Sequence, residues 1–293
     1  MHQSHSMHRR AAYSALGLVM LFATSLASGQ AIEPGFSANT LPPNDDQSTG
    51  LVAMGFTVDF FGISRSELYV NNNGNVTFDF PLAAFTPFDL TSTGREIIAP
   101  FFADVDTRSA GDPVTYGTGT FDGRPAFGVN WINVDYFASD PAHTNRNSFQ
   151  LILVDRSDIA AGDFDMVFNY DQIQWETGEA SDGNADGLGG DSARVGYSNG
   201  TGAAGTFFEL DGSAVNGAFL DGGPNALVSG RLNSTIDGRY IFESRGGGIE
   251  PPPPPPPPGP APTAISVPAG SPMTWLILIF GLLSLAAFTF RRS

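Results

Sequence analysis

Apolar and polar residues alternate with a period of two along much of this chain, a pattern typical of β-strands. The alternation is clearest in two runs, Ser148–Val154 and Phe164–Tyr170, which the turn-rich segment 155–163 joins. Two runs joined in this way favour a β-hairpin. No window between residues 30 and 250 combines a helical period with capping residues. The predicted fold class is therefore all-β, an antiparallel β-sandwich with a phenylalanine-rich core.

Short apolar segments bounded by glycine, proline, asparagine and aspartate recur throughout this region, and each predicts a strand. The predicted strands are Leu51–Phe61, Glu67–Asn71, Asn75–Phe80, Ile97–Asp104, Val114–Phe121, Ala126–Phe137, Ser148–Val154, Phe164–Tyr170, Ala193–Tyr197, Thr206–Leu210 and Tyr240–Glu243.

The stretch from Leu68 to Arg108 has the most specific pattern in the chain. Its first half, LYVNNNGNVTF, predicts a hairpin with a type I′ turn at Asn73-Gly74, because this pair tolerates positive φ angles. Its second half, IIAPFFADVDTR, is an apolar run that ends in two carboxylates, Asp104 and Asp106.

These two segments together resemble the core signature of the nidogen-like extracellular domain, or NIDO domain. Further blocks follow in the same order, so that the resemblance covers roughly Phe60 to Arg245; they are NSFQ at 147–150, FNY at 168–170, IQW at 173–175, ARVGY at 193–197 and GRYIF at 238–242. The resemblance implies an extracellular binding or adhesion module and does not imply a reaction.

Residues 1–29 are predicted to be a secretory signal helix. Arg9 and Arg10 supply the positive region, and Leu16 to Phe22 supply most of the apolar region. Ala27 and Gly29 are the small residues of the cleavage site, and cleavage is expected after Gly29, with Ala27 as the alternative. An uncleaved anchor helix is the alternative. We expect the mature β domain to occupy residues 30–250.

The C-terminal region predicts a stalk and an anchor. Residues 251–272 are a proline-rich linker, expected to be a semi-rigid polyproline II spacer. Within residues 273–293, an uncharged run from Thr274 to Phe290 precedes two arginines, which predicts one short transmembrane helix with the domain outside. The tail resembles bacterial sorting tails of the PEP-CTERM and IPTL-CTERM type, although neither short motif is present, and implies a sorting protease as a partner. A plain membrane anchor is the alternative.

Composition excludes several classes of function. The chain has no cysteine, so that it forms no disulfide and carries no thiol chemistry. Fourteen basic residues against thirty acidic ones give a net charge of −16, which argues against nucleic acid as a partner. Without cysteine, and with His143 as the single histidine after the leader, a zinc site within one chain is disfavoured.

Two catalytic interpretations have some support in the sequence. Residues 196–200, GYSNG, match the G-x-S-x-G nucleophile elbow, but a glycine-rich turn and a predicted strand follow where a helix is required. A pair of acidic residues acting on envelope polysaccharide stays open, because aspartate and glutamate are plentiful and their spacing selects no pair.

Calcium is the one metal that the sequence favours. Asp182, Asn184 and Asp186 match the first half of an EF-hand-type loop, in which oxygen ligands alternate before a glycine. The expected acidic twelfth position is Ala193, and Asp191 lies two residues earlier. A glycine-rich hairpin loop is the alternative.

Asp104 and Asp106 form a second candidate calcium site. They share one side of the strand if it extends that far, because side chains alternate along a strand. The alternative is that both side chains face solvent and form hydrogen bonds with a turn.

The function expected from these patterns is a non-enzymatic extracellular module for adhesion or matrix binding, displayed at a bacterial envelope. Its expected partner is an extracellular protein or polysaccharide. The expected localisation is the cell envelope, either membrane-anchored or released after cleavage of the tail. An enzyme acting on envelope polysaccharide, and a purely structural component of a biofilm or surface layer, are the alternatives.

Overall fold

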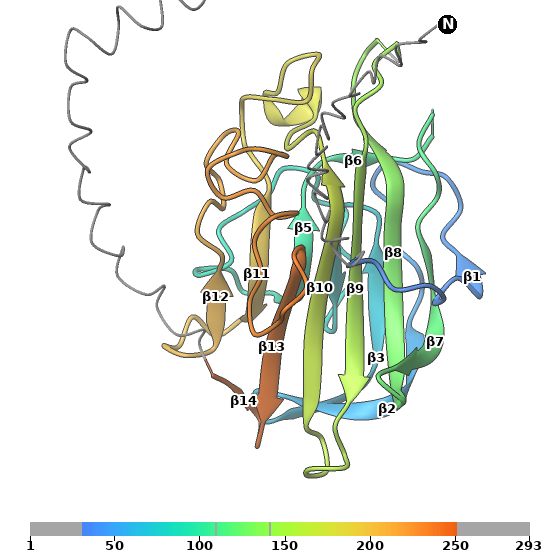
Figure 1. The fold of residues 1–293 in the computed structure, drawn as a ribbon, viewed down its shortest axis with the longest axis vertical. Helices are drawn as coiled ribbons and strands as arrows, with labels where there is room; N and C mark the ends of the chain where they lie inside the picture. The colour runs from blue at the N-terminus through green and yellow to red at the C-terminus, as the bar shows by residue number, and fades with distance from the viewer. Residues whose placement is uncertain (1–30, 109, 141, 251–293) are drawn as a thin grey trace, which may run out of the picture. The chain divides into compact units, whose positions relative to one another are not determined.

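In a computed structural model, the described part of the chain forms two antiparallel β-sheets packed face to face (Figure 1). The described residues are 31–108, 110–140 and 142–250. The expected signal helix, proline-rich linker and C-terminal helix lie outside them. Within the described ranges, no helix is long and apolar enough to cross a membrane. The prediction of an antiparallel all-β fold is thus confirmed for the domain.

The larger sheet has eight strands, and all of its pairings are antiparallel (Figure 1). Strand β6 (Val105–Asp106) pairs with the upper end of β8, off the main path. The main path runs β1 (Asn39–Thr40), β7 (Thr115–Phe121), β8 (Arg124–Tyr136), β9 (Asn147–Asp155), β10 (Phe164–Ile173), β13 (Arg239–Arg245) and β14 (Gly248–Ile249).

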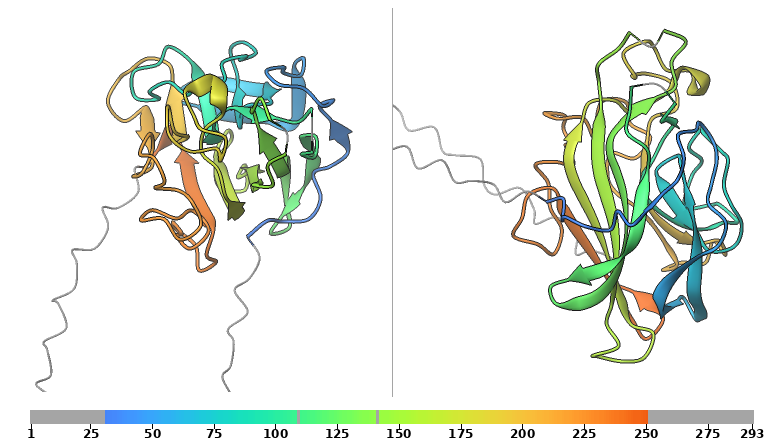
Figure 2. Two further views of the ribbon diagram at one scale, coloured as in Figure 1. Left: turned by 90° about the horizontal axis from the view of Figure 1, so that it is seen from above. Right: turned by 90° about the vertical axis from the view of Figure 1, so that its right-hand side faces the viewer.

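The smaller sheet has six strands and lies against one face of the larger one, as the views from above and from the side show (Figure 2). A single 3₁₀ turn, η1 (Glu179–Ser181), is the one helical element among the described residues. The strands follow the order β12 (Phe207–Glu209), β11 (Arg194–Asn199), β5 (Glu96–Phe102), β4 (Asn75–Thr77), β3 (Ile63–Asn71) and β2 (Val52–Phe60).

Every strand predicted from the sequence has a counterpart in the structure, with ends that differ by a few residues. The predicted hairpin is β9–β10, in which Leu151 pairs with Phe168. The three strands that the sequence did not predict, β1, β6 and β14, are two residues long each. Such short strands contain no full period of alternation and therefore carry no sequence signal.

The predicted type I′ turn at Asn73-Gly74 is wrong. Asn71 pairs with Asn75, so that the β3–β4 loop has three residues, and only Gly74 among them has a positive φ, of 71°. A type I′ turn needs positive φ at both central positions, whereas a three-residue loop needs one. Gly74 also packs tightly, since a Cβ atom there would lie 1.7 Å from the carbonyl oxygen of Phe101.

Aromatic side chains fill the space between the sheets. Trp131 of β8 stacks on Phe149 of β9 with ring centroids 5.2 Å apart, and Phe101 of β5 reaches the same Phe149 from the facing sheet, also at 5.2 Å. The Trp131 indole donates a hydrogen bond of 2.9 Å to the Asn72 carbonyl, so the one polar atom of this ring is satisfied. The β3–β4 loop is therefore fixed directly to the core.

The outer face of the larger sheet is covered as well, which simple alternation did not predict. Phe36 from the segment before β1 packs there with Ile152, Val154 and Val167. The sheet makes room for this ring at a glycine, because a Cβ atom at Gly128 would lie 2.4 Å from Phe36. Strands β9 and β10 are consequently buried on both faces along most of their length.

Candidate metal centre

The β3–β4 loop is a buried polar junction rather than an exposed turn. Asn72 is fully buried, and its side-chain amide nitrogen donates to three carbonyl oxygens, those of Asn44 at 3.3 Å, Asp45 at 2.5 Å and Val105 at 2.6 Å. Thr107 closes the junction, because its hydroxyl donates to the Asn44 carbonyl at 2.9 Å. The segment around Asn44 is thereby fixed beside the end of β5.

Asn73, the next residue of the loop, positions an acidic side chain. Its amide nitrogen donates to Asp46 Oδ1 at 2.9 Å, and its Oδ1 accepts the backbone N–H of Val105 at 2.9 Å. Both ends of this fully buried side chain are therefore satisfied, and the Asp46 carboxylate is held over the loop.

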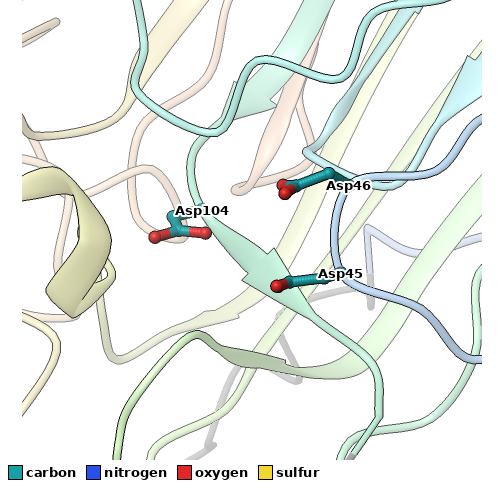
Figure 3. A group of neighbouring side chains, drawn as sticks. All are labelled: Asp45, Asp46 and Asp104. Carbon is teal, nitrogen blue, oxygen red and sulfur yellow. The ribbon is translucent and has the colours of Figure 1, made fainter.

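Three carboxylates converge beside this loop. Asp45 and Asp46 come from the segment before β2, and Asp104 comes from the link between β5 and β6. One oxygen atom from each carboxylate lies within 4.8 Å of one from each of the others, and the side chains face one another in Figure 3. Among the described residues, this is the one group of three or more acidic, histidine or cysteine side chains that is so close.

Two oxygen atoms of this group are buried without a hydrogen-bond partner among the described residues, Asp104 Oδ2 and Asp45 Oδ1. Asp104 itself is only 1% exposed. Burial, and then the charges of Asp45 and Asp46, raise the pKa of Asp104 to about 8. Burial and Asp106 raise the pKa of Asp45 to about 6. The metal-free group thus contains more negative charge than its surroundings stabilise.

Asp106, which the sequence paired with Asp104, faces a cation instead. Its Oδ1 and Oδ2 accept bonds from Arg108 Nε at 3.0 Å and Nη2 at 2.8 Å. The same Nη2 lies 2.8 Å from Asp45 Oδ2. Arg108 therefore pairs with Asp106 and with Oδ2 of Asp45, and leaves Asp45 Oδ1 without a partner among the described residues.

The predicted EF-hand-type loop lies in the connection between η1 and β11. Asn184 Oδ1 accepts the backbone N–H groups of Asp186 at 2.9 Å and Leu188 at 3.1 Å, and so closes a local turn. Asp182 caps η1 in a left-handed conformation with φ of 63°, and Asp191 is exposed. The carboxylates of Asp182, Asp186 and Asp191 do not form a group as close as that of Asp104.

Asp104 was predicted from the sequence as a candidate ligand, whereas Asp45 and Asp46 were not. The run PPNDDQ that contains them reads as an ordinary turn, since proline, asparagine and aspartate all favour turns. The available signal was the pair of adjacent carboxylates after Asn44. Long-range hydrogen bonds, among them those of Asn72 and Asn73, hold that pair near Asp104.

Gly178 shapes the other side of Asp104. It precedes η1, and a Cβ atom built on it would lie 2.2 Å from Asp104 Oδ2. Its φ of −90° is accessible to any residue. The glycine is therefore needed for the space that it leaves to the carboxylate.

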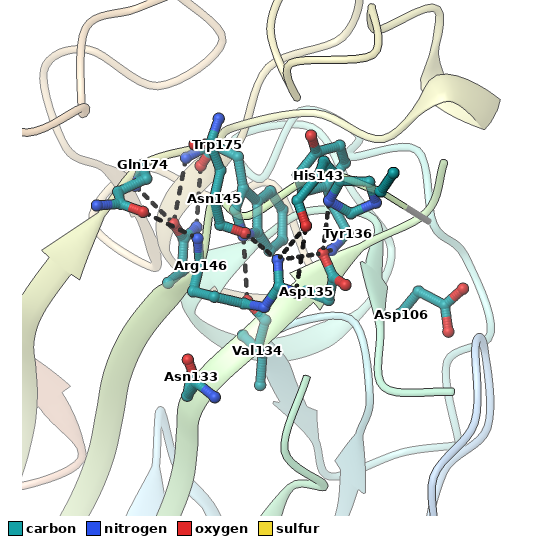
Figure 4. Close-up of polar contacts among 12 residues, drawn as sticks. Asp106, Asn133, Val134, Asp135, Tyr136, His143, Asn145, Arg146, Gln174 and Trp175 are labelled. Atoms are coloured by element: carbon teal, nitrogen blue, oxygen red, sulfur yellow. Dashed lines mark hydrogen bonds and ion pairs between the residues drawn. The ribbon is translucent and has the colours of Figure 1, made fainter. Parts of the chain in front are cut away.

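A second buried charge network lies near the end of β8 (Figure 4). Asp135 Oδ1 lies 3.1 Å from both His143 Nδ1 and Arg146 Nη1, and the His143 ring packs 4.2 Å from that of Tyr136. Because Arg146 shares the carboxylate oxygen with His143, the network ties residues 142–146 to β8. The geometry is that of a loop anchor.

The G-x-S-x-G match falls inside the smaller sheet. Ser198 is a fully buried residue of β11 that pairs with Ile97 on one side and Phe207 on the other. The chain continues through a turn into β12, as the sequence analysis expected. A nucleophile elbow needs an exposed serine between a strand and a helix, and neither condition is met here.

The fold and the site together define an all-β module built around a buried asparagine-rich loop. The sequence model of the nidogen-like domain (NIDO) family matches residues 66–123 and 114–246. These matches extend over more than half of the chain, and the chain belongs to the nidogen-like domain family. The resemblance noted in the sequence is thus confirmed for the domain.

Curated relatives agree with this assignment. Alpha-tectorin of Mus musculus is 34% identical over 235 residues, which cover 72% of this chain and 10% of that protein. Nidogen of Drosophila melanogaster is 28% identical over 229 residues, 69% of this chain and 15% of that protein. Nidogen-2 of Mus musculus is 29% identical over 110 residues, 37% of this chain and 8% of that protein. The chain thus spans a small part of these relatives' length, and no solved structure matches it.

Proposed function

We propose that this chain is a non-enzymatic extracellular module for adhesion or matrix binding, displayed at a bacterial envelope. The observation that carries the proposal is membership of the nidogen-like family, with alpha-tectorins and nidogens among its relatives. The partner is an extracellular protein or polysaccharide.

The arrangement of the chain supports display outside the cell. In the sequence, a signal-like segment precedes the β domain, and a proline-rich spacer and an apolar segment with terminal arginines follow it. A net charge of −16 and the absence of cysteine suit a soluble exported domain that needs no disulfide. The proposal includes anchoring by the C-terminal segment, or sorting by a membrane protease that removes it.

Display is tested by producing the full chain in a bacterial host with both of its ends intact. Surface labelling or protease treatment of intact cells should reach the β domain, and a cytoplasmic control protein should stay protected. Mass measurement of the mature chain then separates anchoring from sorting, because an intact Arg292 excludes cleavage of the tail. Domain that is accessible only after lysis would overturn display.

Adhesion is tested by applying the purified full chain to arrays of matrix proteins and polysaccharides. Saturable binding without release of product supports the proposal. Release of shortened polysaccharide would favour the enzymatic alternative. Self-assembly without binding to any array component would favour a structural matrix role.

A further inference from the structure

We propose that Asp45, Asp46 and Asp104 bind one Ca²⁺ ion, which ties the segment before β2 to the end of β5. This metal site is independent of the adhesion partner, so that either proposal can fail without the other. The three carboxylates face one another in Figure 3, and the ion would lie among them.

The first argument is the unpartnered Asp104. The residue is 1% exposed, its Oδ2 is buried and accepts no hydrogen bond from the described residues, and one oxygen of the same carboxylate lies within 4.8 Å of an oxygen of Asp45 and of Asp46. Buried carboxylates are ordinarily paired with a cation or with several donors, since burial of an unpaired charge is costly. A bound cation supplies the missing partner.

The second argument is the set of oxygens left free by neighbouring donors. Arg108 occupies Asp45 Oδ2, and Asn73 occupies Asp46 Oδ1. Asp45 Oδ1 is buried and accepts no bond from the described residues. Each of the three carboxylates therefore keeps an oxygen for an ion, while a protein donor fixes the orientation of two of them.

Distance and chemistry favour Ca²⁺ among common metals. Calcium–oxygen distances of about 2.4 Å place two ligands on opposite sides of an ion about 4.8 Å apart. The three carboxylates meet this limit, as their oxygens lie within 4.8 Å of one another. All three ligands are carboxylate oxygens, whereas Zn²⁺ sites are usually built from histidine and cysteine. Mg²⁺ requires shorter contacts in a near-octahedral arrangement.

The ion would join parts of the chain that no strand pairing joins at this point. Asp45 and Asp46 precede β2 in the smaller sheet, and Asp104 leads into β6 of the larger one. Asn72 already connects the two segments through the backbone carbonyl oxygens of Asp45 and Val105. Calcium would add a charge-based link beside this hydrogen-bonded one.

The test uses the full chain, freed of metal with chelator and titrated with calcium chloride by calorimetry and thermal unfolding. We expect one ion per chain. The melting temperature should rise by roughly 5–10 °C when free Ca²⁺ exceeds the dissociation constant about 100-fold. No binding and no shift at millimolar calcium would overturn the proposal, as would an equal shift from sodium chloride at matched ionic strength.

Variants locate the site. Asp104→Asn and Asp46→Asn should abolish the calcium shift, whereas the double variant Asp186→Asn/Asp191→Asn, in the EF-hand-type loop, should keep it. In chelator, Asp104→Asn should melt no lower than the unmodified chain, because it replaces a buried carboxyl group whose Oδ2 has no hydrogen-bond donor among the described residues. In calcium it should melt lower than the unmodified chain. This reversal separates ion binding from a purely structural role.

A response kept by Asp46→Asn and lost by the double variant would place the ion in the other loop and overturn the proposal. Asp46 is partly exposed, so Asp46→Asn serves as the test if Asp104→Asn does not fold.

Discussion

The side-chain amide nitrogen of Asn72 lies 2.6 Å from the backbone carbonyl oxygen of Val105, and the contact is buried. It joins the loop of the β3–β4 hairpin to the strand that follows the apolar run of β5. The most specific stretch of the sequence is thus one physical unit, whose two halves are linked by an asparagine side chain.

We expect Asn72→Ala to destabilise the domain by about 1–3 kcal/mol, because three carbonyl oxygens lose a donor and two of these hydrogen bonds are buried. Urea unfolding measures the change. Asn39→Ala is the matched control: the Asn39 side chain is exposed and donates a long bond of 3.4 Å to the Tyr116 carbonyl, so that the substitution should change stability by less than about 0.5 kcal/mol. Equal effects of the two substitutions would contradict the central role of Asn72.

Phe36→Ala should cost about 3–5 kcal/mol, since it uncovers the outer face of β9 and β10 around Ile152 and Val167. Phe80→Ala provides the comparison, because Phe80 is 64% exposed and its ring contacts Arg95 in a surface cation–π pair. It should cost less than about 1 kcal/mol. Unfolding midpoints in urea distinguish the two outcomes, and a small effect of Phe36→Ala would show that the outer cover is dispensable.

Gly178→Ala should weaken calcium binding, because the added methyl group would lie 2.2 Å from Asp104 Oδ2 and force the carboxylate to move. Gly50→Ala is the control, since a Cβ atom there meets nothing within 4 Å and its φ is not positive. Calorimetric titration with calcium chloride should show a lower affinity for the first variant only. Unchanged affinity would mean that Asp104 is not held by this contact.

The metal-free protein should lose stability as pH rises from about 5 to about 8.5. The pKa of Asp104 rises from 3.8 to about 8 on folding, so the folded state binds this proton more tightly than the unfolded state does. The stabilisation that comes from this proton is fully present below the pKa of Asp104 in the unfolded chain, and it is lost as the pH rises through the pKa of Asp104 in the folded protein. The charged neighbours are Asp45, Asp46 and Asp106, which raise this pKa, and Arg108, which lowers it.

Thermal unfolding in chelator across this range measures the effect. Asp104→Asn should flatten the dependence, leaving mainly the smaller part that comes from Asp45, whose pKa is raised to about 6. A slope that Asp104→Asn leaves unchanged would contradict the assignment to Asp104.

The strands were predictable from sequence because short apolar segments recur between turn residues, and the clearest of them repeat an apolar position every second residue, as Phe164, Met166 and Phe168 do. The second, outer layer of packing was not predictable. Phe36 is an isolated aromatic residue among glycine, proline and serine, and nothing in its neighbourhood indicates the sheet face that it covers. The length of the β3–β4 loop was also missed, because the local preference of Asn73-Gly74 did not decide it.

One of the three carboxylates in the acidic group could be found from the sequence. Asp104 follows a buried strand, and a carboxylate at such a strand end is a visible signal. Asp45 and Asp46 lie in a segment without periodicity, and long-range hydrogen bonds from Asn72 and Asn73 determine where they go. Local rules describe the elements of this domain, and the side chains of a buried loop determine how distant segments meet.

The edge strands of both sheets determine whether neighbouring copies of the domain can pair with one another at high local concentration. The larger sheet ends in β1 and β14, of two residues each, and the smaller one ends in the three-residue β12 and in β2. The pairing of β2 is interrupted between Ala53 and Val58, where Gly55 has a φ of 90°. Short and irregular edges offer little template for lateral strand pairing. Many copies can therefore stand side by side without fusing into a continuous sheet.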